Sequence, residues 1–233
     1  MHILPESPEA IDAALTVLQS GGIVIHATET CYGIACDLTN PKAVEKLFRV
    51  KKRPPDQPVS ALFPSMSKAE EYVDFSPRAL ELAKKYLPGP LTIVLPSKAD
   101  SPNLFVMPSP PAPLPVRPHP GGPFRERGDS FPSPRRGEEL GVGATIGIRI
   151  SSFPLAQILA SRFGKPMATT SANLHGLPNP YSVADIQLQL ADQQHLPDLF
   201  IDSGSLPIAP PSTVIEVIGQ ELRVLRKGEI AIY

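Results

Sequence analysis

The alternation of helix and strand that decides the fold is set out in residues 7–25, SPEAIDAALTVLQSGGIVI. Ser7 is a residue type that caps helix N-termini, and Pro8 suits the first helical position because its φ is fixed and its missing N–H is not needed there. The glycine pair Gly21-Gly22 ends this helix, since glycine accepts the left-handed backbone that commonly follows a helix. The β-branched run at 23–25 then begins a strand.

The same signals recur along the chain. Asn40-Pro41 and Ser76-Pro77 repeat the cap-then-proline start of a helix, and Ser182 caps another. We also expect a helix over residues 154–163. The remaining strands are expected at residues 59–63, 91–95, 145–150 and 167–169, and near Leu199, Val214 and Val224. Such an alternation is typical of an α/β or α+β layer fold.

One segment breaks this pattern. Eleven of the 30 prolines fall between Ser101 and Gly143, together with five arginines. The segment has no apolar periodicity, so it cannot bury enough surface to offset the entropy lost on ordering. We therefore predict a single domain spanning residues 1–233, interrupted by a Pro/Arg-rich, disordered insert at about 101–143.

Composition excludes several classes of protein. The formal net charge is −1 at pH 7, which argues against a protein whose main task is gripping a phosphate backbone. No apolar run reaches the roughly 18 residues that would indicate a membrane-spanning helix, and the N-terminus does not look like a signal peptide. We expect a cytoplasmic protein with no membrane contact. Cys31 and Cys36 lie five apart in one expected strand segment, which points them to opposite faces, so we expect unpaired thiols.

Known nucleotide and metal motifs are missing. The sequence has neither a G-x-x-x-x-G-K-[ST] loop nor a correctly spaced G-x-G-x-x-G, and its five histidines show no paired metal spacing. We expect no metal site built by protein ligands. Any metal would be Mg²⁺ that arrives with phosphates.

Three polar clusters follow expected strands or helices. Residues 28–33, Thr-Glu-Thr-Cys-Tyr-Gly, can bind a small ligand, although threonine hydroxyls at a strand end more often satisfy the backbone. Lys51 and Arg53 lie at the end of a helix, where cations complement the macrodipole. If the chain leaves that helix in extended form, both cations point to one side and suit a polyphosphate. Ser171 and Asn173 would also share one side, or cap a helix.

Taken together, these segments resemble the YrdC/TsaC family of threonylcarbamoyl-AMP synthases, in its short form without an extra C-terminal domain. The resemblance covers nearly the whole chain outside the insert. Its ordered motifs are T-E-T-x-Y-G at 28–33, K-x-R-P at 51–54, L-P-G-P-L-T at 87–92, T-S-A-N-L at 170–174, S-T-V at 212–214 and L-R-x-G at 225–228.

The resemblance implies an α/β fold with a twisted, mixed, mostly parallel-stranded sheet and flanking helices around a concave, positively lined site. It also assigns residues by position. The catalytic set is Lys51, Arg53, Ser171 and Asn173. The ATP-binding set is Lys51, Arg53, Thr145, Ser171, Asn179 and Arg226, and the threonine-binding set is Thr28, Arg149, Thr169 and Ser212.

The activity implied by the resemblance is that of an L-threonylcarbamoyladenylate synthase, a nucleotidyltransferase. It would make threonylcarbamoyl-AMP and pyrophosphate from L-threonine, bicarbonate or CO₂, and ATP with Mg²⁺. The product would pass to a tRNA threonylcarbamoyl transferase complex, with direct tRNA contact at most weak.

Two alternatives remain open. The concave face could bind RNA, including double-stranded RNA, with the insert's arginines enlarging it. Alternatively, the chain could be a paralogue that keeps the nucleotide pocket but transfers another acyl or carbamoyl group. Three positions depart from the family pattern, namely Ala27, Pro211 and Lys227.

Overall fold

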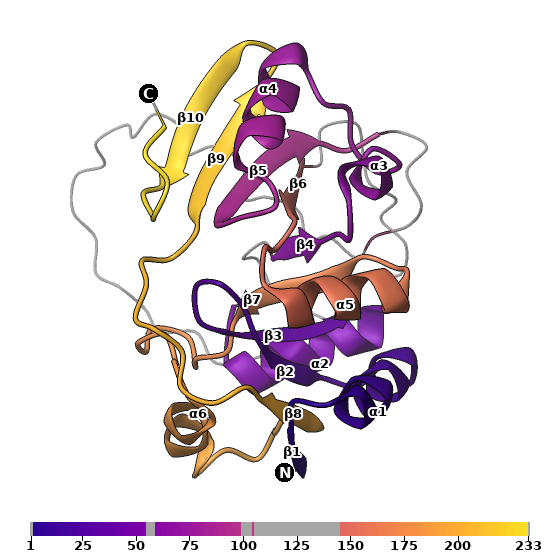
Figure 1. Cartoon of the computed structure of the whole chain (residues 1–233), viewed down its shortest axis with the longest axis vertical. Helices are drawn as coiled ribbons and strands as arrows, with labels where there is room; N and C mark the ends of the chain where they lie inside the picture. Colours follow the sequence, from indigo (N-terminus) through magenta and orange to yellow (C-terminus); the bar gives the residue numbers. More distant parts are fainter. Residues whose placement is uncertain (1, 55–58, 99–103, 105–144, 233) are drawn as a thin grey trace, which may run out of the picture.

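The computed structural model describes residues 2–54, 59–98, 104 and 145–232. Their strands form one mixed sheet in the order β1-β8-β2-β3-β7-β4-β6-β5-β9-β10, which runs from β1 near the N-terminus to β10 near the C-terminus (Figure 1). The strands are β1 (His2–Pro5), β2 (Val24–Ala27), β3 (Tyr32–Asp37), β4 (Ser60–Leu62), β5 (Leu91–Pro96), β6 (Thr145–Arg149), β7 (Met167–Ser171), β8 (Leu199–Asp202), β9 (Thr213–Ile218) and β10 (Glu221–Arg226).

The predicted α/β class and mixed sheet are confirmed, but the sheet is not mostly parallel. Among the described strands five pairings are antiparallel and four are parallel. Two of the antiparallel pairings arise because β2 returns directly as β3 through a tight turn and β9 returns directly as β10. The other three, β3–β7, β4–β7 and β5–β6, join strands that lie far apart in the chain.

The capped helices form as their sequence signals predict. The helices are α1 (Pro8–Gln19), α2 (Pro41–Lys51), α3 (Met66–Ala69), α4 (Pro77–Tyr86), α5 (Pro154–Phe163) and α6 (Val183–Leu190). Side-chain oxygens of Ser7, Asn40, Ser76 and Ser182 accept hydrogen bonds from first-turn N–H groups, as expected for N-caps. The short α3 was not predicted, although Ser65 caps it by accepting from the N–H of Lys68 at 3.2 Å. The first strand, β1, was not predicted either.

Two apolar clusters hold the helices against the sheet. Helices α1 and α5 pack together and against β2 and β8, through residues such as Leu15, Leu159 and Leu199. Helices α2 and α4 contact β3 and β5, with Leu47, Leu82 and Ile93 in the larger cluster.

Strand alternation leaves part of the sheet open. On β9, Ile215 and Val217 are buried in the larger cluster, while Val214 and Glu216 line a cavity. Thr92 and Val94 do the same on β5, between buried Leu91, Ile93 and Leu95. Because successive side chains of a strand point to opposite faces, the same strands that build the core also build the site.

The predicted insert lies almost entirely outside the described residues. Leu104 is the one described residue of 101–143, and its side chain is buried in the larger apolar cluster. The single-domain assignment with its insert therefore stays a prediction. Within the described ranges, no helix has the length and apolar character needed to span a membrane.

Candidate active site

A cavity of about 670 Å³ lies on the open part of the sheet. Its walls come from the β2–β3 turn and from strands β4, β5, β6, β7, β9 and β10. Of the residues that the sequence assigned to catalysis and binding, all but Lys51 and Asn173 line this cavity. Those that do are Thr28, Arg53, Thr145, Arg149, Thr169, Ser171, Asn179, Ser212 and Arg226.

Lys51 lies behind the cavity wall instead of in it. The chain does not leave α2 in extended form, because Lys52 adopts a left-handed backbone with φ of 50° and the N–H of Arg53 returns to the carbonyl of Phe48 at 3.1 Å. The buried Lys51 ammonium donates to the carbonyl of Ser171 and, at 2.8 Å, to the carbonyl of Asn173. It therefore holds the end of β7 in place.

Burial is the main cause of an unusual titration of Lys51. Desolvation, followed by the charge of Arg53, lowers the pKa of Lys51 from 10.5 to about 7. Its hydrogen-bond partners among the described residues are neutral oxygens and not carboxylates.

Ser171 and Asn173 share a side, as predicted, but they do different things. The Ser171 hydroxyl donates to Asn173 Oδ1 at 2.5 Å and also lines the cavity. The Asn173 amide donates to the carbonyl of Leu177 at 2.5 Å and so closes the turn that follows β7. The turn-closing role is thus observed for Asn173, and a catalytic role for either residue stays a prediction.

Arg53 and Arg226 bring cationic groups to the cavity. Arg53 Nη1 donates to the Thr170 hydroxyl at 3.2 Å. Arg226 reaches Ser212 twice, from Nε to the carbonyl at 3.0 Å and from Nη2 to the hydroxyl at 2.8 Å. Burial first, and then the neighbouring Arg226, lowers the pKa of Arg53, while burial and then Arg149 lower the pKa of Arg226. Each shift is caused mainly by burial, and a neighbouring arginine adds a smaller contribution.

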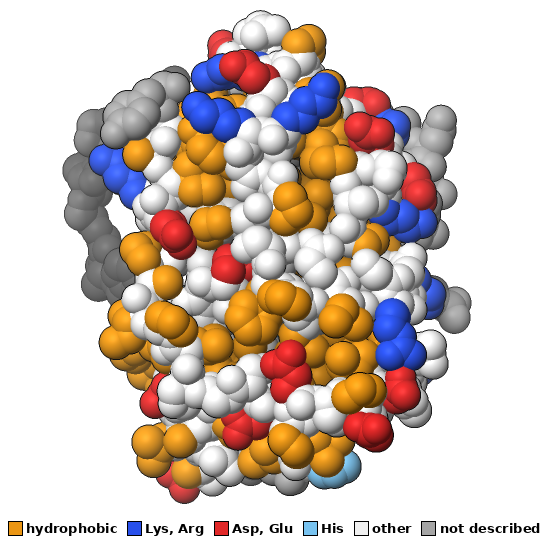
Figure 2. All heavy atoms as spheres, viewed as in Figure 1, with side chains coloured by type: hydrophobic (Ala, Val, Ile, Leu, Met, Phe, Trp, Pro, Cys, Tyr) orange, Lys and Arg blue, Asp and Glu red, His pale blue; other side chains and the backbone are white. Residues whose placement is uncertain are grey.

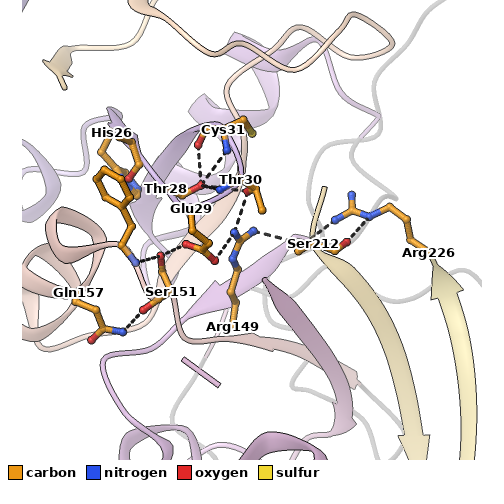
Figure 3. Close-up of polar contacts among 12 residues, drawn as sticks. His26, Thr28, Glu29, Thr30, Cys31, Arg149, Ser151, Gln157, Ser212 and Arg226 are labelled. Atoms are coloured by element: carbon orange, nitrogen blue, oxygen red, sulfur yellow. Dashed lines mark hydrogen bonds and ion pairs between the residues drawn. The ribbon is translucent and has the colours of Figure 1, made fainter. Parts of the chain in front are cut away.

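Arg149 is held differently, as Figure 3 shows. Its Nη2 donates to Glu29 Oε1 at 2.9 Å and to the Thr30 hydroxyl at 3.1 Å. Its Nη1 lies 3.5 Å from the Ser212 hydroxyl, the same group that Arg226 reaches (Figure 3). The sequence reading did not assign Glu29, because the pairing of a turn carboxylate with an arginine 120 residues away has no local signal.

The Thr28 hydroxyl closes its own turn. It donates to the carbonyl of Cys31 at 2.6 Å and accepts from the N–H groups of Thr30 and Cys31, each at 3.3 Å (Figure 3). The interpretation that a threonine hydroxyl in this turn satisfies backbone groups is therefore confirmed. Thr28 also lines the cavity, so its contact with an amino acid stays a prediction.

Apolar side chains, one carboxylate and a further arginine also line the cavity. Val94, Val214, Ile218 and Leu225 form an apolar surface on β5, β9 and β10, and Glu216 and Arg223 lie on the same strands, β9 and β10. The two cysteines are unpaired, as predicted. Among the described residues, no group of three or more His, Cys, Asp or Glu side chains is placed to hold a metal ion.

The fold and site together define an α/β protein with an arginine- and hydroxyl-lined cavity on the face of a mixed sheet. Guanidinium groups with converging donors suit a polyanionic ligand such as a polyphosphate. The Sua5/YciO/YrdC family model, which carries the description "Telomere recombination", matches residues 16–110 and 140–228. The chain belongs to this family.

Individual relatives agree with this assignment. The chain is 31% identical over 186 residues to the threonylcarbamoyl-AMP synthase of Photobacterium profundum. The aligned region covers 78% of this chain and 82% of that protein.

Two solved structures are also similar. The first is P. abyssi Sua5 complexed with L-threonine, with a TM-score of 0.72 and 26% identity over 97% of this chain. The chain spans 57% of that protein's length. The second is E. coli YciO, with a TM-score of 0.70 and 25% identity, covering 97% of this chain and 94% of that protein.

Proposed function

We propose that the chain is an L-threonylcarbamoyladenylate synthase, which forms threonylcarbamoyl-AMP and pyrophosphate from L-threonine, bicarbonate or CO₂, and ATP. The observation that carries the proposal is the convergence of Arg53, Arg149 and Arg226 on one cavity. The similarity to a synthase of that name, and to a Sua5 structure that contains L-threonine, supports it.

The reaction needs two bond-forming steps. The threonine amine attacks the carbon of CO₂, or of bicarbonate with loss of water, and gives up a proton to form a carbamate. A carbamate oxygen then attacks the α-phosphorus of ATP, and the bond from that phosphorus to the bridging oxygen breaks as pyrophosphate leaves. The second step brings two anions together, and the first step does so when bicarbonate is the reactant. Positioning and charge stabilisation are therefore the contributions that a protein can make.

In this proposal the two substrates occupy two neighbouring parts of the cavity, which meet at the Ser212 hydroxyl that both Arg149 and Arg226 reach. Arg53 and Arg226 would contact the phosphates, where guanidinium groups stabilise charge that develops on the oxygens around phosphorus. Thr145, Ser171 and Asn179 would orient the nucleotide. In the other part, the Nη1 side of Arg149 would receive the threonine carboxylate, beside Thr28, Thr169 and Ser212.

Lys51 and Asn173 would act from behind the wall. Lys51 fixes the main chain at Ser171, and Asn173 closes the turn after it, so both hold Ser171 toward the cavity. In this proposal they are positioning residues, which replaces the direct phosphate contact that the sequence suggested for Lys51.

Mg²⁺ would enter with ATP, because triphosphate oxygens are the ligands that it prefers. Bound there, it would neutralise charge on the leaving pyrophosphate. The arginines would then contact the phosphate oxygens that the metal ion leaves accessible.

The test is a pyrophosphate-release assay with purified protein, ATP, Mg²⁺, bicarbonate and a panel of amino acids, with mass spectrometry of the adenylate. We expect release that requires bicarbonate and threonine together, and an adenylate that carries a threonylcarbamoyl group. Release that ignores threonine, or that responds equally to serine, valine and threonine, would point to the paralogue alternative with a different substrate.

Transfer to RNA is a separate step in this proposal. The product would be passed to a tRNA threonylcarbamoyl transferase complex, and any direct contact of this chain with tRNA would be local. On the face shown in Figure 2, acidic and basic side chains are interspersed, and the net charge of the chain is −1. A gel-shift assay with tRNA and with double-stranded RNA should show weak binding that salt removes.

A further inference from the structure

Glu29 is a nearly buried carboxylate that holds the Arg149 guanidinium from behind. Its Oε1 accepts from Arg149 Nη2 at 2.9 Å, and its Oε2 accepts from the hydroxyl of Ser151 (Figure 3). The side chains of Glu29 and Arg149 are each 12% exposed, and Ser151 is fully buried. An ion pair in such a place is screened far less than one on the surface.

The contacts of Ser151 anchor this carboxylate to α5. The Ser151 hydroxyl accepts from the N–H of Phe153 at 3.2 Å, and its carbonyl accepts from the Gln157 side chain (Figure 3). Glu29 is therefore fixed at both oxygens, one by the start of α5 and the other by the arginine at the end of β6.

Glu29 does not line the cavity, whereas Arg149 does. Any effect of Glu29 on a ligand must therefore pass through Arg149, either through the orientation of its guanidinium or through the field of the pair. The neighbouring Arg226 has no such carboxylate, since its hydrogen bonds among the described residues go to the carbonyl and hydroxyl of Ser212.

We propose that Glu29 is a positioning and specificity-determining residue that makes one end of the cavity fit a zwitterionic amino acid and reject a polyphosphate. The identity of the amino acid rests on the proposed function. Glu29 offsets the charge of Arg149 and turns the Nη2 side away from the cavity, which leaves the Nη1 side for a single carboxylate. Arg226, whose hydrogen bonds among the described residues go to neutral oxygens, keeps its charge for the phosphates.

The physical reason lies in the charges of the two ligands. A zwitterionic amino acid has no net charge, so it loses little affinity when the charge of Arg149 is offset by Glu29. One correctly oriented guanidinium can still bind its carboxylate. A triphosphate carries several negative charges and would be drawn to any cation that lacks a counter-charge. Without Glu29, Arg149 would become a second polyphosphate site and would lose its fixed orientation.

The experiment measures the Glu29→Gln variant in two ways. In the steady-state assay, kcat/KM for threonine should fall roughly 10- to 100-fold through a raised threonine KM, because the guanidinium is no longer fixed. The KM for ATP should not rise. In calorimetry without any amino acid, inorganic pyrophosphate should bind roughly 3- to 10-fold more tightly than to the wild type, because one negative charge has been removed beside the cavity.

Two further variants keep the result interpretable. Glu29→Gln combined with Arg149→Gln removes both charges, so pyrophosphate affinity should return to the wild-type value while the threonine KM stays high. Ser151→Ala loosens Glu29 but keeps its charge, so it should raise the threonine KM by a smaller factor without tightening pyrophosphate. The double variant also serves if Glu29→Gln alone melts at low temperature, since it leaves no buried unpaired charge.

Pyrophosphate affinity that is the same in wild type and Glu29→Gln would overturn the proposal. So would equal rises in the threonine and ATP KM values, which a general loss of structure would cause. Failure of the proposed function looks different, because the wild type itself would then show no threonine-dependent turnover. The pyrophosphate titration still reports the role of Glu29 in that case.

Discussion

Two arginines, Arg149 and Arg226, meet at the hydroxyl of Ser212, at 3.5 and 2.8 Å, and they differ in what stands behind them. Arg149 is paired with Glu29, whereas Arg226 is held by neutral oxygens only, among the described residues. The comparison teaches that two like side chains on one cavity can have different electrostatic surroundings. The difference comes from a carboxylate in a distant turn, and in our proposal it assigns the two arginines to different ligands.

Arg53 provides the strongest test of the phosphate contacts that we propose. If Arg53 stabilises charge on the transferring phosphate, Arg53→Ala should lower turnover by about 10²–10³, by analogy with the loss of one oxyanion-hole donor. Thermal melting should change little. The measurement is adenylate formation at saturating ATP and threonine, with melting followed in parallel.

Lys52→Ala is the matched control for Arg53→Ala. Lys52 is adjacent to Arg53 and is exposed, and we expect its left-handed backbone to be the same in wild type and variant. Truncating its side chain should therefore change neither turnover nor the melting temperature appreciably. If Lys52→Ala and Arg53→Ala caused equal, small losses of turnover, this segment would be a solvated helix end. Arg53 would then have no catalytic role.

Lys51 tests whether a buried cation without a carboxylate partner among the described residues lowers the free energy of unfolding. Its pKa of about 7 in the folded chain lies below its ordinary value of 10.5. Between these two pH values the unfolded chain binds more protons, so the free energy of unfolding should rise with pH. Below about pH 7 both states are protonated and this contribution is constant.

The measurement compares wild type with Lys51→Met by urea unfolding at several pH values. From about pH 7 to pH 9, the wild type should gain on the order of 1–3 kcal/mol relative to the variant, while shared titrations cancel. Lys52→Met, as control, should leave the pH slope of the wild type unchanged. A difference between wild type and Lys51→Met that is independent of pH would contradict the assigned desolvation of Lys51.

The insert gives the smallest expected effect. Deleting residues 108–136 should leave a folded protein with nearly wild-type turnover, because the composition of this segment offers no apolar pattern for a core. The deletion retains Leu104, which is buried, and Thr145, which lines the cavity. An insoluble product, or an altered ATP KM, would show that the insert contributes to the fold or to the nucleotide end.

Local chemistry explains what the sequence could predict of the fold. The caps Ser7, Asn40, Ser76 and Ser182 accept from N–H groups three or fewer residues away, so the starts of their helices could be predicted from local sequence. The strand β1 was missed because its pairing with β8 joins residues almost 200 positions apart. The expectation of a mostly parallel sheet failed for a similar reason, since strand direction depends on which strands become neighbours.

In the site, too, the features set by local sequence could be predicted, and those set by distant contacts could not. The motifs placed most of the assigned residues on one cavity, because each motif lies at a strand end or beside one. They did not anticipate the left-handed turn at Lys52, and Lys51 does not line the cavity beside Arg53. A catalytic role for Lys51 stays a prediction. They also gave no sign that Glu29 pairs with Arg149, because such a pairing exists only once the β2–β3 turn meets the end of β6.

The most direct test of the two-ended cavity is a pair of matched variants, Arg149→Gln and Arg226→Gln, in one steady-state assay. The account predicts opposite patterns. Arg149→Gln should raise the threonine KM roughly tenfold or more and the ATP KM by a clearly smaller factor, because it removes a positive charge beside the phosphates. Arg226→Gln should raise the ATP KM roughly tenfold or more and spare threonine. If both variants raise both KM values equally, the two arginines serve one shared ligand, and the division of the cavity by Glu29 is wrong.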